Sequence, residues 1–159
     1  MKLYMREKVF TLNERFNVRD EWGNDKYYVE GEFFSLGKKL HLLNVHGEEV
    51  AFIRQELLTL MPRFTVSVAG RELATIRKEF TLFFQRYAID GLGWEVDGSV
   101  MMHDYVITKN SRTIVRITKE WFTWGDSYVL DIADPADELV ALAVVLTIDC
   151  VAEASRNNG

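Results

Sequence analysis

The sequence DPADELVALAVVLTIDCVAEASRNNG, which runs from Asp134 to Gly159, predicts a single α-helix. Asp134 is a favourable N-cap, because its carboxylate can accept hydrogen bonds from the free backbone N–H groups of the first turn. Pro135 suits the first helical position, where no N–H is needed. We expect the helix to span about residues 135–154 and the polar tail, residues 155–159, to fray.

The middle of this helix is apolar on every side. All residues from Leu139 to Leu146 are apolar, and Thr147 and Ile148 extend the run to Asp149. A helix with no polar face must be surrounded, either by protein or by lipid. The run is about ten residues long, whereas a membrane span needs roughly 20 apolar residues. The sequence therefore favours a buried central helix; packing on one face of a sheet and membrane insertion are the alternatives.

The rest of the chain alternates apolar and polar residues with a period of two, which is typical of half-buried strands. Polar turns, several with glycine, separate about ten to twelve such segments, and this regular spacing predicts an antiparallel sheet closed as a barrel or sandwich. The segments are Val9–Leu12, Phe16–Val18, Lys26–Phe34, Leu40–Val45, Val50–Leu58, Arg63–Val68, a long run from Leu73 to Ile89, Tyr105–Thr108, Thr113–Phe122 and Ser127–Ile132, with Asp90–Gly93 and Asp97–Gly98 as loops.

A weak internal repeat supports a curved sheet. VAFIRQE (Val50–Glu56), LATIRKE (Leu73–Glu79) and IVRITKE (Ile114–Glu120) each place Ile three residues before Glu. Such hairpin units are too small to bury their own faces and pack side by side. A sheet that closes around the helix would also lose its free edges. We therefore predict a mainly β (α+β) fold: one domain, residues 1–159, with a closed antiparallel β-barrel around a central hydrophobic C-terminal helix.

Composition limits the partners and the compartment. The net charge is −5 and the sequence pI is about 5.3, which disfavours binding to nucleic acid. The single cysteine, Cys150, cannot form an internal disulfide, so a reducing cytoplasm is expected. The N-terminal segment lacks the apolar stretch of a signal peptide. We expect a cytoplasmic protein without a transmembrane segment, either free or peripheral at the membrane.

The sequence contains no recognisable catalytic constellation and indicates no cofactor. It has no GxGxxG, P-loop or GxSxG motif, and its histidines, His41, His46 and His103, lack zinc-ligand spacing. Cys150 lies in the apolar helix, where burial raises a thiol pKa and makes the group unreactive. His103 and Asp104 resemble a base and its orienting carboxylate, but adjacent residues of a strand point to opposite faces.

The segment DGLGWEVDGSVMMHD, residues 90–104, is the remaining candidate for catalysis. Asp90, Glu95, Asp97 and Asp104 lie close together in this segment and would be the ligands of a metal-dependent enzyme. The order of oxygen ligands does not match that of an EF-hand loop. Solvated turn carboxylates are the favoured interpretation.

Basic residues in the repeat form a candidate anion-binding site. Arg54 and Arg77 hold the same repeat position, so neighbouring strands would place them on one face, beside Lys78. Two or three such side chains can bind a phosphate or a phospholipid headgroup. The alternative is that the basic residues pair with Glu56, Glu72 and Glu79.

The aromatic residues Trp94, Trp121, Phe122 and Trp124 are interpreted as anchors within strands and turns. An exposed WFTW segment, residues 121–124, would instead be a binding surface.

Four stretches together resemble the LURP-one-related proteins of the tubby C-terminal-like superfamily, and specifically a short bacterial member. They are FNVRDEWGNDKYYVEGEFF (Phe16–Phe34), NVHGEEVAFIRQ (Asn44–Gln55), WEVDG (Trp94–Gly98) and DELVALAVVLTID (Asp137–Asp149). The resemblance implies a barrel of about 12 strands around a central hydrophobic helix, in agreement with the interpretation above.

The resemblance also implies possible ligands. Tubby-like relatives bind phosphatidylinositol bisphosphate through basic barrel residues, phospholipid scramblases of similar fold are linked to calcium and membranes, and plant LURP-one-related proteins are associated with pathogen defence. The tubby lipid-binding residues do not map one by one onto this sequence. Scrambling is not carried over, because the one cysteine lies inside the helix.

The sequence therefore predicts a non-enzymatic cytoplasmic binding or scaffold protein. Its ligand would be a phospholipid headgroup, a small anion or a protein partner. The first alternative is a peripheral membrane protein that binds anionic phospholipid or phosphoinositide headgroups through Arg54, Arg77 and Lys78. The second is a metal-dependent enzyme that uses the Asp90–Asp104 segment.

Overall fold

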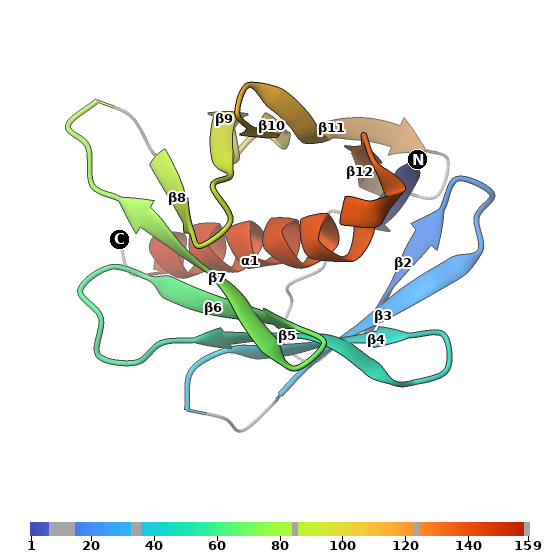
Figure 1. The fold of residues 1–159 in the computed structure, drawn as a ribbon, viewed down its shortest axis with the longest axis horizontal. Helices are drawn as coiled ribbons and strands as arrows, with labels where there is room; N and C mark the ends of the chain where they lie inside the picture. Colours follow the sequence, from blue (N-terminus) through green and yellow to red (C-terminus); the bar gives the residue numbers. More distant parts are fainter. Residues whose placement is uncertain (7–14, 33–35, 84–85, 123–124, 158–159) are drawn as a thin grey trace.

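The computed structural model describes residues 1–6, 15–32, 36–83, 86–122 and 125–157, with the backbone alone at 121, 122, 125 and 126. These residues form twelve antiparallel strands in a closed barrel, followed by a 3₁₀ helix and one α-helix (Figure 1). The strands are β1 (Lys2–Arg6), β2 (Phe16–Asp20), β3 (Asp25–Gly31), β4 (Lys39–Asn44), β5 (Glu49–Gln55), β6 (Arg63–Val68), β7 (Arg71–Glu79), β8 (Arg86–Asp90), β9 (Glu95–Ser99), β10 (Asp104–Lys109), β11 (Arg112–Phe122) and β12 (Gly125–Ile132).

Each strand pairs with its neighbours in sequence, and β1 closes the barrel by pairing with β12, where Leu3 lies opposite Leu130. The pairing is uneven around the barrel. β8 and β9 are joined at one register pair, Ala88 opposite Glu95, whereas β11 and β12 are paired along eight positions. The fold predicted from the sequence is confirmed, including closure as a barrel.

The internal repeat supplies part of the core. Its isoleucines, Ile53 on β5, Ile76 on β7 and Ile117 on β11, are all at most 1% exposed. Inward-facing residues alternate with outward-facing ones along each strand, so this recurring Ile keeps the same inward position in each unit. These side chains form one cluster with the helix, which packs most extensively against β5, β6 and β7.

The helix begins as predicted at Asp134, whose Oδ1 accepts a hydrogen bond of 2.9 Å from the Ala136 N–H. Residues 135–137 form the 3₁₀ helix η1, and the α-helix α1 spans Glu138–Asn157. Every residue from Ala141 to Ala152 is buried, which confirms the central position of the helix. Among the described residues, no helix has the length and hydropathy required to cross a bilayer.

The helix continues further than the sequence predicted. Residues 155–157 belong to α1 rather than to a frayed tail, while residues 158–159 lie outside the described residues. The Ser155 hydroxyl donates a hydrogen bond of 2.7 Å to the Val151 carbonyl, one turn earlier. Arg156 lies in the last turn, where a positive charge favourably opposes the helix dipole.

Several strand boundaries differ from the prediction. β1 was not predicted, and the predicted strand Val9–Leu12 lies outside the described residues. The run from Leu73 to Ile89 is broken between β7 and β8. Asp97–Gly98 lies within β9 rather than in a loop: Gly98 has φ +115°, and a Cβ there would be 2.6 Å from the Asp104 carbonyl oxygen. Glycine is therefore required by the close approach of β10.

The aromatic anchors can be assessed only in part. Trp94 is buried in the core, at 6% exposure, as an anchor should be. The side chains of the WFTW segment lie outside the described residues, so its role as an anchor or as a surface stays a prediction.

Leu142→Asp should prevent folding to a soluble protein, because it places an unpaired charge at a fully buried position on α1. We expect a loss of at least about 3 kcal/mol in the free energy of unfolding. The matched control is Asn157→Asp, at an exposed position of the same helix. Soluble yield and thermal melting measure both variants. A soluble Leu142→Asp protein with near-native melting would contradict the central position of the helix.

Candidate functional site

The two rims of the barrel have different connections. In a closed antiparallel barrel, connections after odd-numbered strands lie at one rim and connections after even-numbered strands at the other. We call the first the loop rim; among the described residues it includes the connections β3–β4, β5–β6, β7–β8 and β9–β10. The other is the turn rim, made of shorter turns. The β5–β6 and β7–β8 hairpins project beside the C-terminal end of α1 (Figure 1).

Exposed apolar side chains concentrate at the loop rim. Among the described residues, eleven large apolar side chains are exposed, and nine of them lie in connections of the loop rim. The other two, Trp22 and Val45, lie at the turn rim. The nine are Leu36, Leu57, Leu58, Leu60, Phe80, Leu82, Phe83, Met101 and Met102.

Three neighbouring hairpins carry seven of these side chains. The β3–β4 connection is hydrogen-bonded to the end of β5: the Lys38 N–H donates to Gln55 Oε1 at 3.1 Å, and the Gln55 N–H donates to the Lys38 carbonyl at 2.8 Å. A groove of about 570 Å³ lies between the β5–β6 and β7–β8 hairpins, with Leu60 and Phe80 in its lining. We define the apolar loop face as Leu36, Leu57, Leu58, Leu60, Phe80, Leu82 and Phe83.

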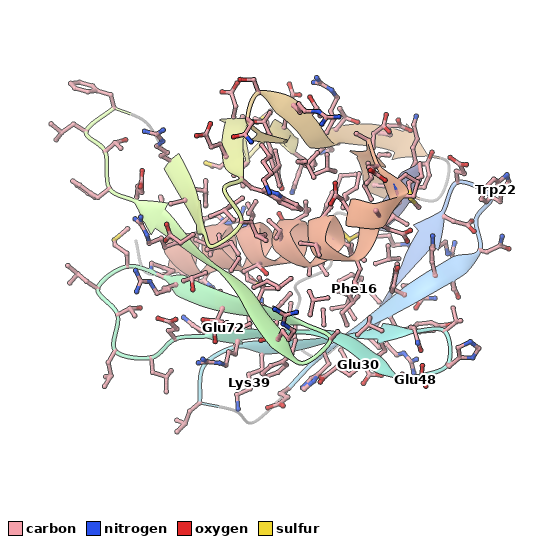
Figure 2. The ribbon with its side chains drawn as sticks, in the orientation of Figure 1. Phe16, Trp22, Glu30, Lys39, Glu48 and Glu72 are labelled. Carbon is pink, nitrogen blue, oxygen red and sulfur yellow. The ribbon has the colours of Figure 1, made fainter. Side chains whose placement is uncertain are left out.

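Charge is also distributed unevenly between the rims. Acidic residues cluster at the turn rim; Figure 2 shows Trp22 and Glu48 on the same side of the molecule but well apart. They include Asp20, Glu21, Glu48, Glu49, Asp90, Glu95, Asp134 and Asp137. Basic residues surround the apolar loop face, namely Lys38, Lys39, Arg54, Arg63, Arg77, Lys78, Arg86 and Arg156. The acidic groups beside them are in ion pairs: Glu153 with Lys38, Glu32 with Lys39, Glu56 with Arg63, and Glu79 with Arg77 and Arg86.

The predicted anion site is only partly assembled. Arg54 and Arg77 lie on the outer face, as the repeat predicts, but both are in ion pairs. Arg77 Nε donates to Asp90 Oδ2 at 2.9 Å, and Arg54 Nη2 is 3.8 Å from Glu72 Oε2. The alternative interpretation, pairing with neighbouring glutamates, therefore describes the outer face. Such exposed pairs contribute little to stability.

Lys78 lies elsewhere. Lys78 follows Ala74 and Ile76 at a spacing of two and therefore points inward, as they do. It lies near the end of β7, where the barrel opens. It makes no ion pair with any residue that the structure describes. Lys78 and Arg77 both line the groove at the loop rim, together with Arg63. The groove, and not the outer face, is where basic side chains adjoin the apolar loop face.

The acidic residues of the segment from residue 90 to 104 are not gathered into one cluster. Its four acidic residues are distributed over β8, β9 and β10 and are exposed. Across the described ranges, no group of three or more His, Cys, Asp or Glu side chains is placed to hold a metal ion. Asp90 instead pairs with Arg77.

A buried polar cluster on α1 was missed by the sequence analysis. Asp149 is 6% exposed, and its Oδ2 accepts a hydrogen bond from the Tyr128 hydroxyl of β12. His103, in the β9–β10 connection, places Nε2 4.0 Å from Asp149 Oδ1 and stacks its ring on Tyr128, with centroids 4.6 Å apart. His103 therefore faces Asp149 and not its sequence neighbour Asp104. An ionisable residue inside an apolar helical run is the signal that could have revealed this cluster.

Burial dominates the electrostatics of the cluster. It raises the pKa of the Asp149 carboxyl to about 7, although Tyr128, Arg156 and Lys38 favour the ionised form. The neighbouring Cys150 thiol has its pKa raised to about 12 by burial, as expected for an unreactive thiol. The Tyr105 hydroxyl is buried and has no hydrogen-bond partner among the described residues. Among these groups, the Asp149 carboxyl has its pKa raised toward neutral pH.

Comparisons with known proteins agree with the resemblance. The chain is 32% identical over 151 residues to the uncharacterised protein YxjI of Bacillus subtilis (strain 168), covering 95% of this chain and 93% of YxjI. It is also similar to an X-ray structure of a protein from Arabidopsis thaliana, with a TM-score of 0.63 and 18% identity, covering 94% and 90% of the two chains. The sequence profile of the LURP-one-related family matches residues 1–149. The chain therefore belongs to the LURP-one-related family.

Proposed function

We propose that this protein is a non-enzymatic, cytoplasmic binding protein that attaches reversibly to anionic phospholipid membranes through the apolar loop face. The observation that supports the proposal is the concentration of exposed Leu and Phe side chains on three neighbouring hairpins, surrounded by basic residues. A concentration of exposed apolar side chains with a polar border is typical of an interaction surface.

The form of the patch favours a bilayer over a protein partner. Leu58 and Leu60 on the β5–β6 hairpin and Phe83 on the β7–β8 hairpin are each more than 80% exposed and protrude into solvent. A fluid bilayer can accommodate side chains that protrude individually. Transfer of one Leu or Phe side chain out of water contributes about 1.5–3 kcal/mol, so a few of them suffice for micromolar binding.

The charge distribution favours one orientation on the membrane. Each Lys or Arg close to an anionic surface contributes about 1 kcal/mol. Eight basic residues lie around the apolar loop face, so an anionic surface attracts this rim more strongly than the turn rim. Local charge thereby overcomes the net charge of −5.

The site offers binding rather than catalysis. Its groove is lined by apolar and basic side chains and by Glu79, which is in ion pairs with Arg77 and Arg86. The one acid–base pair that the described residues form in the interior, His103 with Asp149, is enclosed by the barrel. These features support attachment without turnover.

Exchange of loop-face side chains should abolish membrane binding without affecting stability. We expect the wild-type protein to co-sediment with vesicles that contain anionic phospholipid, more at low than at physiological salt, and not with neutral vesicles. The variant Leu58→Ser/Leu60→Ser should bind at least about tenfold more weakly, because apolar burial in the bilayer is lost. Its melting temperature should not change, since both residues are fully exposed.

The matched control is Trp22→Ser, a 77% exposed side chain at the turn rim, which should bind like the wild type. Equal binding by the wild type and by Leu58→Ser/Leu60→Ser would contradict the assignment of this face. Absence of wild-type binding to any vesicle would contradict membrane attachment and direct the search to protein partners.

Charge reversal should have a stronger effect at the loop rim than at the turn rim. Lys78→Glu replaces a cation of the groove that has no ion-pair partner among the described residues. It should weaken binding to anionic vesicles on the order of tenfold. Arg112→Glu, at the start of β11 on the turn rim, is the control and should leave binding unchanged. If both reversals weaken binding equally, overall charge and not the groove governs attachment.

A further inference from the structure

We propose that Asp149, Tyr128 and His103 form a proton-operated latch. While the cluster holds one proton, the β9–β10 connection, residues 100–103, stays closed over Asp149; loss of that proton releases it. The inference does not depend on membrane attachment and is tested without lipid.

The cluster joins three separate parts of the chain. Asp149 belongs to α1, Tyr128 to β12, and His103 to the β9–β10 connection. Tyr128 is 1% exposed and held by its hydrogen bond to Asp149, so it provides a fixed surface for the His103 ring. The ring stacks on it at an interplanar angle of 10°. These contacts attach the short surface turn at residues 100–103 to the central helix.

The turn itself needs such contacts. His103 has φ +50°, in the left-handed region that few residues other than Gly adopt, although His, Asn and Asp are enriched there. Within the turn, the His103 N–H donates to the Val100 carbonyl at 3.1 Å, and the Met102 N–H donates to Ser99 Oγ at 3.3 Å. The conformation is therefore maintained by two local hydrogen bonds together with the packing of the His103 ring.

Loss of one proton changes the net charge of the pair formed by His103 and Asp149. Shared between the His103 ring and the Asp149 carboxyl, it gives either a neutral pair or an ion pair, and both are neutral overall. When this proton leaves to solvent, a carboxylate remains in the interior opposite a neutral imidazole. An uncompensated buried charge is strongly unfavourable. The His103 side chain is 19% exposed, so movement of its turn would admit water to Asp149.

The other charged groups around Asp149 do not compensate the charge of its ionised carboxylate. Lys38 is in an ion pair with Glu153, and Arg156 lies in the last turn of α1. Both favour the ionised carboxyl, but burial outweighs them. The inward residues of β5, β6 and β7 are apolar except for Lys78, which lies near the loop-rim end of β7. The remaining titratable groups that interact with Asp149 are Tyr87, Tyr105, Cys150 and Glu153.

The turn that carries His103 also carries exposed apolar side chains. Met101 and Met102, in the same turn, are 55% and 70% exposed at the loop rim. Release of the turn would therefore change the position of two apolar side chains at that rim in response to pH.

Hydrogen exchange measured by mass spectrometry tests the latch directly. After correction for the pH dependence of chemical exchange, we expect the wild-type turn, residues 100–103, to exchange at least about tenfold faster at pH ~8.5 than at pH ~6. Asp149→Asn cannot ionise and should show no such change. The turn at Asn110–Ser111, on the other rim, is the internal control. Equal protection of the wild-type turn at both pH values, or the same change in Asp149→Asn, would overturn the proposal.

A second measurement needs no variant. In the wild type, the NMR signals of the His103 ring should shift through the titration of Asp149. The stability of the wild type should also fall as pH rises from about 4 to about 7. Across that window the unfolded Asp149 has released its proton and the folded one still holds it. A His103 signal that follows a single isolated titration would contradict the coupling.

Discussion

The enclosure of a helix that has no polar face is the constraint on which this structure depends. Ala141–Ala152 must lose contact with water on all sides, and one sheet face would cover only part of that circumference. A barrel of twelve strands meets the requirement and also leaves no free sheet edge. The amphipathic strands, in turn, have no other apolar surface against which to bury their inner faces.

The sequence predicts this architecture because the hydrophobic pattern of the helix and that of the strands are both unambiguous. The helix is recognisable from an unbroken apolar run, and the repeat places Ile53, Ile76 and Ile117 at equivalent inward positions. The strand boundaries were less predictable. Phe80 and Leu82 continue an apolar–polar alternation past the end of β7, so a strand and a loop have the same local pattern. Only the tertiary structure determines which apolar residues are covered.

The candidate site was harder to predict from the sequence, for a similar reason. Arg77 and Lys78 are adjacent in the sequence, but strand alternation sends one to the outer face and the other inward, where the barrel opens. Asp149 reads as the residue that ends an apolar run, and its partners Tyr128 and His103 lie 21 and 46 positions away. Pairings over such separations depend on barrel closure. The rims, likewise, exist only once the order of the strands is known.

The position of the helix in the chain has a consequence for synthesis. All twelve strands precede α1, so a ribosome produces every inner sheet face before it produces the segment that covers them. Strand pairing can begin early, since nearly all neighbours are consecutive hairpins. The core cannot exclude water until α1 has been synthesised. The nascent chain therefore passes through a stage with a long amphipathic sheet and no interior, when chaperones that bind exposed apolar strands would have their greatest effect.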